Sequence, residues 1–246
     1  MGFISILKGA FTELFRNPVL FIPKMISVTI WILPYLYLLQ QARFDLAAAR
    51  VSWGTLSATA LIFLISPVWL LIDSMYPVLV EQQRKKKRLD FRAALDHVLG
   101  KFLKLFGLFL ILLIAMTAVS TPFTMLIAFG YVYAFLPALL LGILGIAAII
   151  FIGGIALYFV PTALILEKIG IAESLKAGFR MSKQNFSLVF WLTMASFIFL
   201  ALSFFLEGTM EALGVAGFIF GRYLGGIVTV YMYVVNPTAY FEARKK

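Results

Sequence analysis

Two ionisable residues, Lys24 and Asp73, lie inside apolar stretches of the sequence, where a charge is costly. Each lies about six or seven residues from the end of its stretch, which is roughly 10 Å at 1.5 Å per residue. A single charge at the centre of a membrane helix costs about 2.5–3.5 kcal/mol, and less near an interface. Pairing offsets much of that cost, so we expect a Lys24–Asp73 ion pair that faces the interior of a helical bundle. The alternative is that Lys24 extends to the lipid headgroups and Asp73 reaches water alone.

The remaining side chains offer little catalytic chemistry. His97 is the only histidine, and it follows Asp96; a metal site usually needs three or four ligands. The sequence contains no cysteine, no Gly-x-Ser-x-Gly elbow of a serine hydrolase and no Gly-rich phosphate loop ahead of a lysine. We therefore expect no enzymatic activity, no metal and no cofactor, and we interpret His97 as a solvated residue near a membrane surface.

A run of positive charge follows the second apolar stretch. The residues that we expect to contact anionic lipid are Arg84, Lys85, Lys86, Lys87, Arg88 and Arg92. Clusters of four to eight Lys and Arg beside the cytoplasmic end of a span bind anionic lipid, at about 1 kcal/mol per charge near the surface. We prefer this interpretation to nucleic-acid binding because the cluster adjoins a span. A topology signal without any ligand explains the run nearly as well.

Three glycines at intervals of four residues, Gly217, Gly221 and Gly225, stand in the last apolar stretch. Small residues at this spacing expose the backbone of a helix and allow a second helix to approach closely. We expect this series to serve helix packing inside the chain. Formation of a homo-oligomer is the alternative role.

The elements that position these residues are membrane-spanning helices. Hydrophobic residues make up 63% of the 246 residues and charged residues 13%, against about 25% charged residues in a soluble domain. We predict an all-α membrane protein that forms a single domain over residues 1–246. Its six spans lie near 18–40, 55–80, 104–128, 137–166, 187–206 and 216–239.

The stretch from Leu105 to Leu166 contains no charged residue and is too long for one span. It can hold two helices, or two helices and a short re-entrant segment. The expected kinks or breaks are at Thr121-Pro122 and Leu136-Pro137, because proline disrupts the hydrogen bonds of a helix.

Charge predicts the orientation of the spans. With six spans and a cytoplasmic N-terminus, every Lys and Arg except Arg43, Arg50 and Arg222 falls on the cytoplasmic side. Positive residues concentrate on that side of membrane proteins. We therefore expect a multi-pass protein of the cell membrane with both termini in the cytoplasm.

The chain also reads as three copies of one unit, over residues 1–88, 89–170 and 171–246. In each copy an amphipathic helix at the cytoplasmic interface precedes two spans that form a hairpin, and the hairpin ends in a proline and a glutamate. The prolines are Pro77, Pro161 and Pro237. The apolar stripes of the three amphipathic helices contain Phe3, Leu7, Phe11 and Leu14; Phe91, Leu95, Val98, Leu99 and Phe102; and Ile171, Leu175, Phe179 and Phe186. The alternative is that any membrane hairpin acquires basic, amphipathic inner ends.

The third unit reads "VPTALILEKIGIAESLKAGFRMSKQNFSLVFWL", and the first contains "FRNPVLFIP". These stretches resemble a group of uncharacterised prokaryotic six-helix integral membrane proteins. The group includes archaeal domains of unknown function and is related to the membrane domain of some glycerophosphodiester phosphodiesterases. A fainter similarity, in length, charge and amphipathic helices, is to the sulfate permease of cysteine biosynthesis. The resemblance implies a fold and not a reaction.

The sequence leads to three functional hypotheses. A non-catalytic membrane protein that binds anionic inner-leaflet lipid or a partner protein through its basic cytoplasmic face fits the charge distribution best. A permease or channel for a small solute is the alternative, and the repeat and the two buried charges support it. A coupled transporter usually carries more ionisable groups within its spans. A membrane enzyme ranks last because no catalytic constellation is present.

Overall fold

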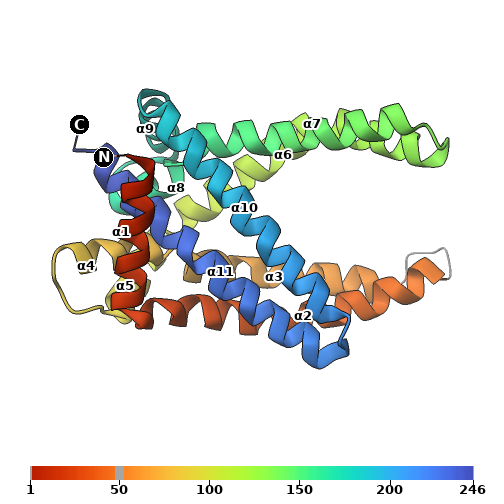
Figure 1. The fold of residues 1–246 in the computed structure, drawn as a ribbon, viewed down its shortest axis with the longest axis horizontal. Helices are drawn as coiled ribbons and strands as arrows, with labels where there is room; N and C mark the ends of the chain where they lie inside the picture. Colours follow the sequence, from red (N-terminus) through yellow and green to blue (C-terminus); the bar gives the residue numbers. More distant parts are fainter. Residues whose placement is uncertain (1, 48–52, 246) are drawn as a thin grey trace. The chain divides into compact units, whose positions relative to one another are not determined.

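The computed structural model describes residues 2–47 and 53–245, and these residues form helices and turns without a β-strand. The elements are α1 (Phe3–Arg16), η1 (Pro18–Leu20), α2 (Phe21–Ala47), α3 (Trp53–Asp73), α4 (Tyr76–Arg84), α5 (Phe91–Leu99), α6 (Phe102–Val132), α7 (Leu136–Leu157), α8 (Val160–Leu166), α9 (Ile171–Gln184), α10 (Phe186–Glu211) and α11 (Gly214–Ala243) (Figure 1). Arg50, predicted on the outer side, lies outside the described residues.

Six helical segments are long and apolar enough to cross a membrane. They are Pro18–Leu38, Thr59–Arg84, Phe102–Val132, Leu136–Leu166, Phe186–Glu211 and Gly214–Ala243. The predictions of an all-helical chain and of six candidate spans are therefore confirmed. Many of their large apolar side chains, such as Leu64 and Ile152, are exposed, as expected of surfaces whose solvent is lipid.

The chain divides into two compact units. The first comprises Met1–Phe102 with Ala195–Lys246, and the second comprises Leu103–Met194. Helix α10 contributes to both, since its first residues belong to the second unit and the rest to the first. These boundaries differ from those of the predicted repeats, and the repeat stays a prediction.

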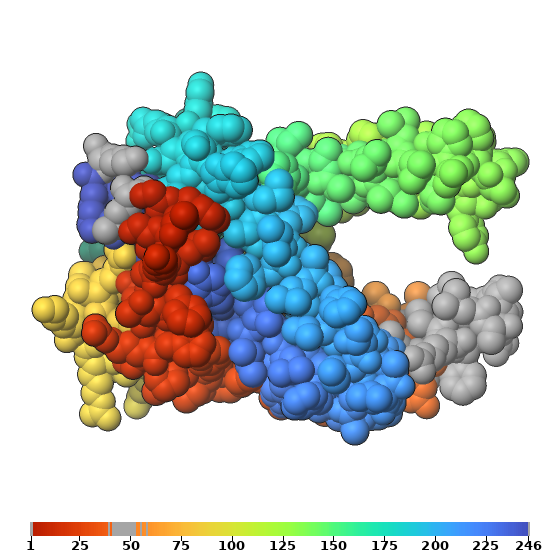
Figure 2. All heavy atoms as spheres, in the orientation of Figure 1, coloured from red at the N-terminus to blue at the C-terminus, as the bar shows by residue number. Residues whose placement is uncertain are grey.

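The first unit is built around α11. Helices α1, α2 and α4 all contact α11, and α2 packs along α3 (Figure 1). Two tyrosine hydroxyls bond to distant parts of the backbone: the Tyr76 hydroxyl donates to the carbonyl of Leu20 (3.0 Å), and the Tyr231 hydroxyl donates to that of Leu7 (2.7 Å). The segment between α4 and α5 projects at the end of the unit beside α1 (yellow and red in Figure 2). We call this region, where α1, α4, α5 and the last turns of α11 meet, the basic end.

In the second unit, α6 and α7 pack through glycines. The backbone at Gly130 lies against Leu139, and Gly142 lies against Ile127. The charge-free stretch holds two long helices, α6 and α7, and the short helix α8, and the alternative with a re-entrant segment stays a prediction. Pro137 stands in the first turn of α7, where a missing N–H is tolerated, so the break predicted there is present. Pro122 lies within continuous α6, so the chain does not break at the other predicted position.

The stretch after each of the three recurring prolines is deeply buried. Pro77 and Pro161 lie in the first turns of α4 and α8, whereas Pro237 lies inside α11. Fully or almost fully buried residues of these stretches include Leu79 and Val80, Leu164 and Ile165, and Ala239 and Tyr240. The recurring sequence pattern therefore marks parts of the core, although only two of the three prolines begin a new helix.

Helices α1 and α9 pack largely through residues outside their predicted apolar stripes. Helix α1 buries Ile6, Ala10 and Leu14 but leaves Phe11 54% exposed. Helix α9 buries Ser174, Gly178 and Ser182, whereas Phe179 is exposed. Small residues allow helix backbones to approach closely, and the exposed aromatic residues then remain available to lipid.

Candidate functional site

The structure brings Lys24 and Asp73 together. The Lys24 ammonium lies 2.7 Å from Asp73 Oδ2, and the two side chains are only 10% and 7% exposed. The ammonium also lies 4.4 Å from the ring centroid of Tyr233 and donates to its hydroxyl (3.3 Å). Helices α2 and α3 position the pair because their ends meet where α11 contributes Tyr233. The second carboxylate oxygen of Asp73 is buried and has no hydrogen-bond partner in the described part of the chain.

A second ion pair joins α10 to α11. Arg222 Nη1 lies 2.8 Å from Glu207 Oε2, and the guanidinium stacks on Tyr35 of α2 at 4.0 Å from the ring centroid. Ser203 donates to the other oxygen of Glu207 (3.0 Å). The charge distribution predicted Arg222 on the outer side, and Glu207 was not among the predicted site residues. Arg222 stands between Gly221 and Gly225 in the sequence, so the glycine series could have indicated that Arg222 lies where α11 packs closely on another helix.

Both ion pairs adjoin one cavity of about 520 Å³ between α2, α3, α10 and α11, which we call the intramembrane cavity. Its lining consists of Lys24, Ser27, Val28, Trp31, Tyr35, Trp69, Ser196, Phe199, Leu200, Ser203, Phe204, Glu207, Arg222, Gly225, Gly226, Thr229, Met232 and Tyr233. Aromatic side chains form much of its wall, and the charged groups are few. This combination is typical of a small-molecule site.

The glycine series explains how the helices around this cavity approach one another. A Cβ on Gly217 would collide with the Met210 carbonyl, and a Cβ on Gly225 would collide with the side chains of Glu207 and Ser203. Gly221 likewise lies against Met210 and Glu207. All three glycines are buried, and their contacts are with α10 of the same chain.

A second cavity, of about 790 Å³, lies at the basic end, and we call it the basic cavity. Its lining comes from the end of α1, from α4 and from the segment that leads to α5: Thr12, Glu13, Arg16, Asn17, Val19, Gln83, Arg84, Lys86, Lys87, Arg88, Leu89 and Phe91. The structure therefore brings Arg16, which was not among the predicted site residues, together with four predicted lipid contacts, Arg84, Lys86, Lys87 and Arg88. The signal for Arg16 was its position at the end of an amphipathic helix.

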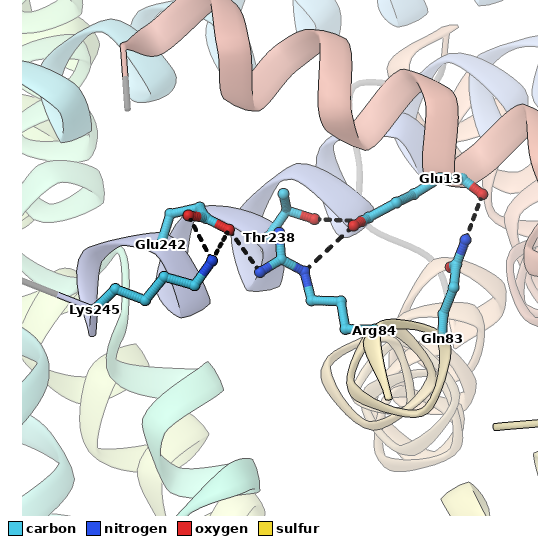
Figure 3. Close-up of polar contacts among 6 residues, drawn as sticks. All are labelled: Glu13, Gln83, Arg84, Thr238, Glu242 and Lys245. Atoms are coloured by element: carbon cyan, nitrogen blue, oxygen red, sulfur yellow. Dashed lines mark hydrogen bonds and ion pairs between the residues drawn. The ribbon is translucent and has the colours of Figure 1, made fainter. Parts of the chain in front are cut away.

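Arg84 is held by carboxylates (Figure 3). Its Nε lies 3.3 Å from Glu13 Oε1, and its Nη1 lies 2.8 Å from Glu242 Oε1. Thr238 donates to the second oxygen of Glu13 (2.8 Å), and Lys245 also pairs with Glu242 (3.0 Å). Arg84 thus joins α4 to α1 and α11. Two carboxylates engage its guanidinium, and the contact of Arg84 with lipid stays a prediction.

The other predicted lipid contacts are exposed. Lys85 pairs with Glu81 one turn earlier in α4. Lys86, Lys87 and Arg88 lie in the segment between α4 and α5, where Lys86 has a φ of 53° that turns the chain. Arg92 is exposed on α5 but does not line the basic cavity. The structure thus gathers only part of the predicted cluster around one cavity.

Comparison with protein-family models, with curated proteins and with solved structures gave no match. Within the described residues, no three His, Asp or Glu side chains gather in a manner that could hold a metal ion. The candidate sites are therefore defined by geometry and charge alone.

Proposed function

We propose that this chain is a non-catalytic, multi-pass membrane protein that binds an anionic lipid headgroup in its basic cavity. The observation that supports the proposal is the convergence of Arg16, Lys86, Lys87 and Arg88 on one cavity. Among the described residues that line it, Glu13 is the only carboxylate, and Arg84 and Thr238 already engage it. A phosphate group would therefore meet uncompensated positive charge there.

The surroundings of the cavity suit a lipid better than a soluble anion. Val19 lines the cavity and is 42% exposed, and Phe15 and Ile22, close to it in sequence, are also exposed apolar residues. An amphiphile needs such a change from cationic to apolar surface at its site. The headgroup would lie among the cations, with its acyl chains along the start of α2.

The basic end faces the cytoplasm in this proposal, and both termini lie on that side of the cell membrane. The distribution of Lys and Arg supports this orientation. We infer that α1, α5 and α9 lie at the inner interface, as the predicted parallel repeat and the resemblance to six-helix prokaryotic membrane proteins suggest. Their exposed aromatic residues, including Phe11 and Phe179, would then contact lipid.

Titration of the purified chain with short-chain lipids tests the proposal. In neutral detergent, dioctanoyl phosphatidylglycerol should bind saturably, and dioctanoyl phosphatidylcholine should not. Replacing Lys86, Lys87 and Arg88 together by Gln should weaken binding about 100-fold, from about 1 kcal/mol per charge. The matched control replaces Lys176, Arg180 and Lys183, three exposed cations of α9, by Gln. An equal loss of lipid affinity in both triple variants would show that only the overall positive charge attracts the lipid. That result would contradict binding in the basic cavity.

A permease for a small solute is the second candidate, and one observation favours it. The intramembrane cavity places charged side chains within candidate spans, where such groups commonly mark substrate pathways. Solute flux into liposomes that contain the purified chain tests this function. Flux that is unaffected by Lys24→Met or Arg222→Gln would argue against a path through the cavity.

A further inference from the structure

The intramembrane cavity contains hydrogen-bonding groups that the ion pairs do not use. Ser27 Oγ, Trp31 Nε1 and Arg222 Nε are buried and have no hydrogen-bond partner within the described residues. All three residues line the cavity, and Ser27 is only 1% exposed. Buried polar groups in folded proteins are nearly always hydrogen-bonded, so three unpartnered donors around one cavity indicate a missing acceptor.

The carboxylate that lines the cavity, Glu207, is in contrast already engaged. One oxygen of Glu207 pairs with Arg222 and the other accepts from Ser203. Lys24 and Arg222 contribute two positive charges to the lining, and each is paired, Lys24 with Asp73 and Arg222 with Glu207. An occupant with acceptor oxygens would complement the three unused donors, and a carboxylate accepts the strongest hydrogen bonds from a charged donor such as Arg222.

From these contacts we propose that the intramembrane cavity binds a small organic carboxylate with an apolar body. Its carboxylate accepts hydrogen bonds from Ser27, Trp31 and Arg222, each of which has an unused donor. This site is separate from the basic cavity and does not depend on lipid binding there.

The size and walls of the cavity suit the apolar body of such a ligand. Its volume of about 520 Å³ lies in the range of small-molecule pockets. Along α2 the lining extends from Lys24 to Tyr35, roughly 16 Å at 1.5 Å per residue. Trp69, Phe199 and Phe204 also line the cavity and would pack against an aromatic or aliphatic group.

Isothermal titration calorimetry on the full-length chain in neutral detergent tests this inference. The probes are benzoate, phenylacetate and 4-phenylbutyrate, each with the amide and the amine of the same carbon skeleton. At least one carboxylate should bind saturably, at least tenfold more tightly than its amide, and the amines should not bind. The absence of saturable binding by all three carboxylates, or equal binding of carboxylate and amide, would overturn the proposal.

Two substitutions place the ligand in the cavity. Ser27→Ala and Trp31→Phe should each weaken carboxylate binding about tenfold, because each removes one hydrogen bond to a charged group. Trp53→Phe, at an exposed residue outside the lining, is the matched control and should bind as the original chain does. The triple Gln variant of the basic cavity should also bind normally, which separates this site from the lipid site.

Ser27→Ala keeps the test valid if Trp31→Phe loses stability, since it removes a single oxygen from the chain. Unchanged affinity in Ser27→Ala and in any folded Trp31→Phe variant would place the ligand elsewhere and overturn the proposal. So would equal weakening by Trp53→Phe.

Discussion

Lys24 and Asp73 are 49 positions apart in the sequence, yet the Lys24 ammonium lies 2.7 Å from the Asp73 carboxylate between two candidate spans. The cation also meets the face of Tyr233, so three helices share the contact. Within lipid such a pair is the main means of keeping two charges at low cost. The relationship therefore links the stability of the α2–α3 hairpin to its packing on α11.

We predict that Lys24 and Asp73 are energetically coupled. Lys24→Met and Asp73→Asn should each destabilise the chain by about 3–5 kcal/mol, because each leaves the other charge buried and unpaired. The double variant should be destabilised by less than the sum of the two single changes. Thermal unfolding in detergent measures the loss of stability in the two single variants and in the double variant. Strict additivity would mean that the side chains act independently, as expected if Lys24 reached the headgroups and Asp73 reached water.

Arg84 should contribute to stability rather than to lipid binding. Arg84→Gln should destabilise the chain by about 1–3 kcal/mol, since Glu13 and Glu242 then lose a charged hydrogen-bond donor. The control, Arg88→Gln, changes an exposed cation and should alter stability by less than about 0.5 kcal/mol. Chemical unfolding monitored by tryptophan fluorescence distinguishes the two. Similar small effects would show that the network of Figure 3 does not hold α4 to α1 and α11.

Opposite effects are expected for alanine at two glycines of neighbouring helices. Gly225→Ala should destabilise by about 1–3 kcal/mol, because the new methyl group meets Glu207 and Ser203. Gly208→Ala should stabilise by about 0.5–1 kcal/mol, since nothing lies within 4 Å of a Cβ there and alanine favours a helix. Thermal unfolding of both variants checks the signs. A neutral Gly225→Ala would show that the side chains of Glu207 and Ser203 are not held in place by their ion pair and hydrogen bond.

The spans, Lys24 and Asp73 could be predicted from the sequence because they depend on local pattern. A long apolar run identifies a span, and a charge inside it stands out. Glu207 was not predicted because it lies near the end of its run, where a solvated position is equally consistent with the sequence. Its burial depends on the contact with Arg222 across the α10–α11 turn.

The packing faces of the short helices were harder to predict for a different reason. In water the apolar stripe of a helix is the buried one, whereas in lipid the apolar stripe can face the solvent. Helix α9 therefore buries Gly178 against Val160 and exposes Phe179. Periodicity alone does not distinguish these two cases.

The role of Arg84 could not be predicted from the sequence either. The sequence places Arg84 in a basic cluster, and only the tertiary fold brings Glu13 and Glu242 to it.

The proposed orientation predicts the location of inserted reporters. A reporter fused after Lys246 or inserted near Gln83 should report cytoplasm. One inserted near Ala48, which lies outside the described residues, should report the opposite side, because positive charge stays in the cytoplasm. Paired fluorescent and phosphatase reporters measure this. A cytoplasmic signal near Ala48 would exclude the arrangement of six spans with both termini inside.

Native mass spectrometry of the full-length chain, extracted from cell membranes in mild neutral detergent, tests lipid binding most directly. We predict that the original chain and the Lys176→Gln, Arg180→Gln, Lys183→Gln control both retain an anionic phospholipid. The Lys86→Gln, Lys87→Gln, Arg88→Gln variant should lose it, since the loss of three cavity cations weakens binding about 100-fold. Equal retention by all three proteins, or retention of neutral phospholipid in the same amount, would contradict binding in the basic cavity.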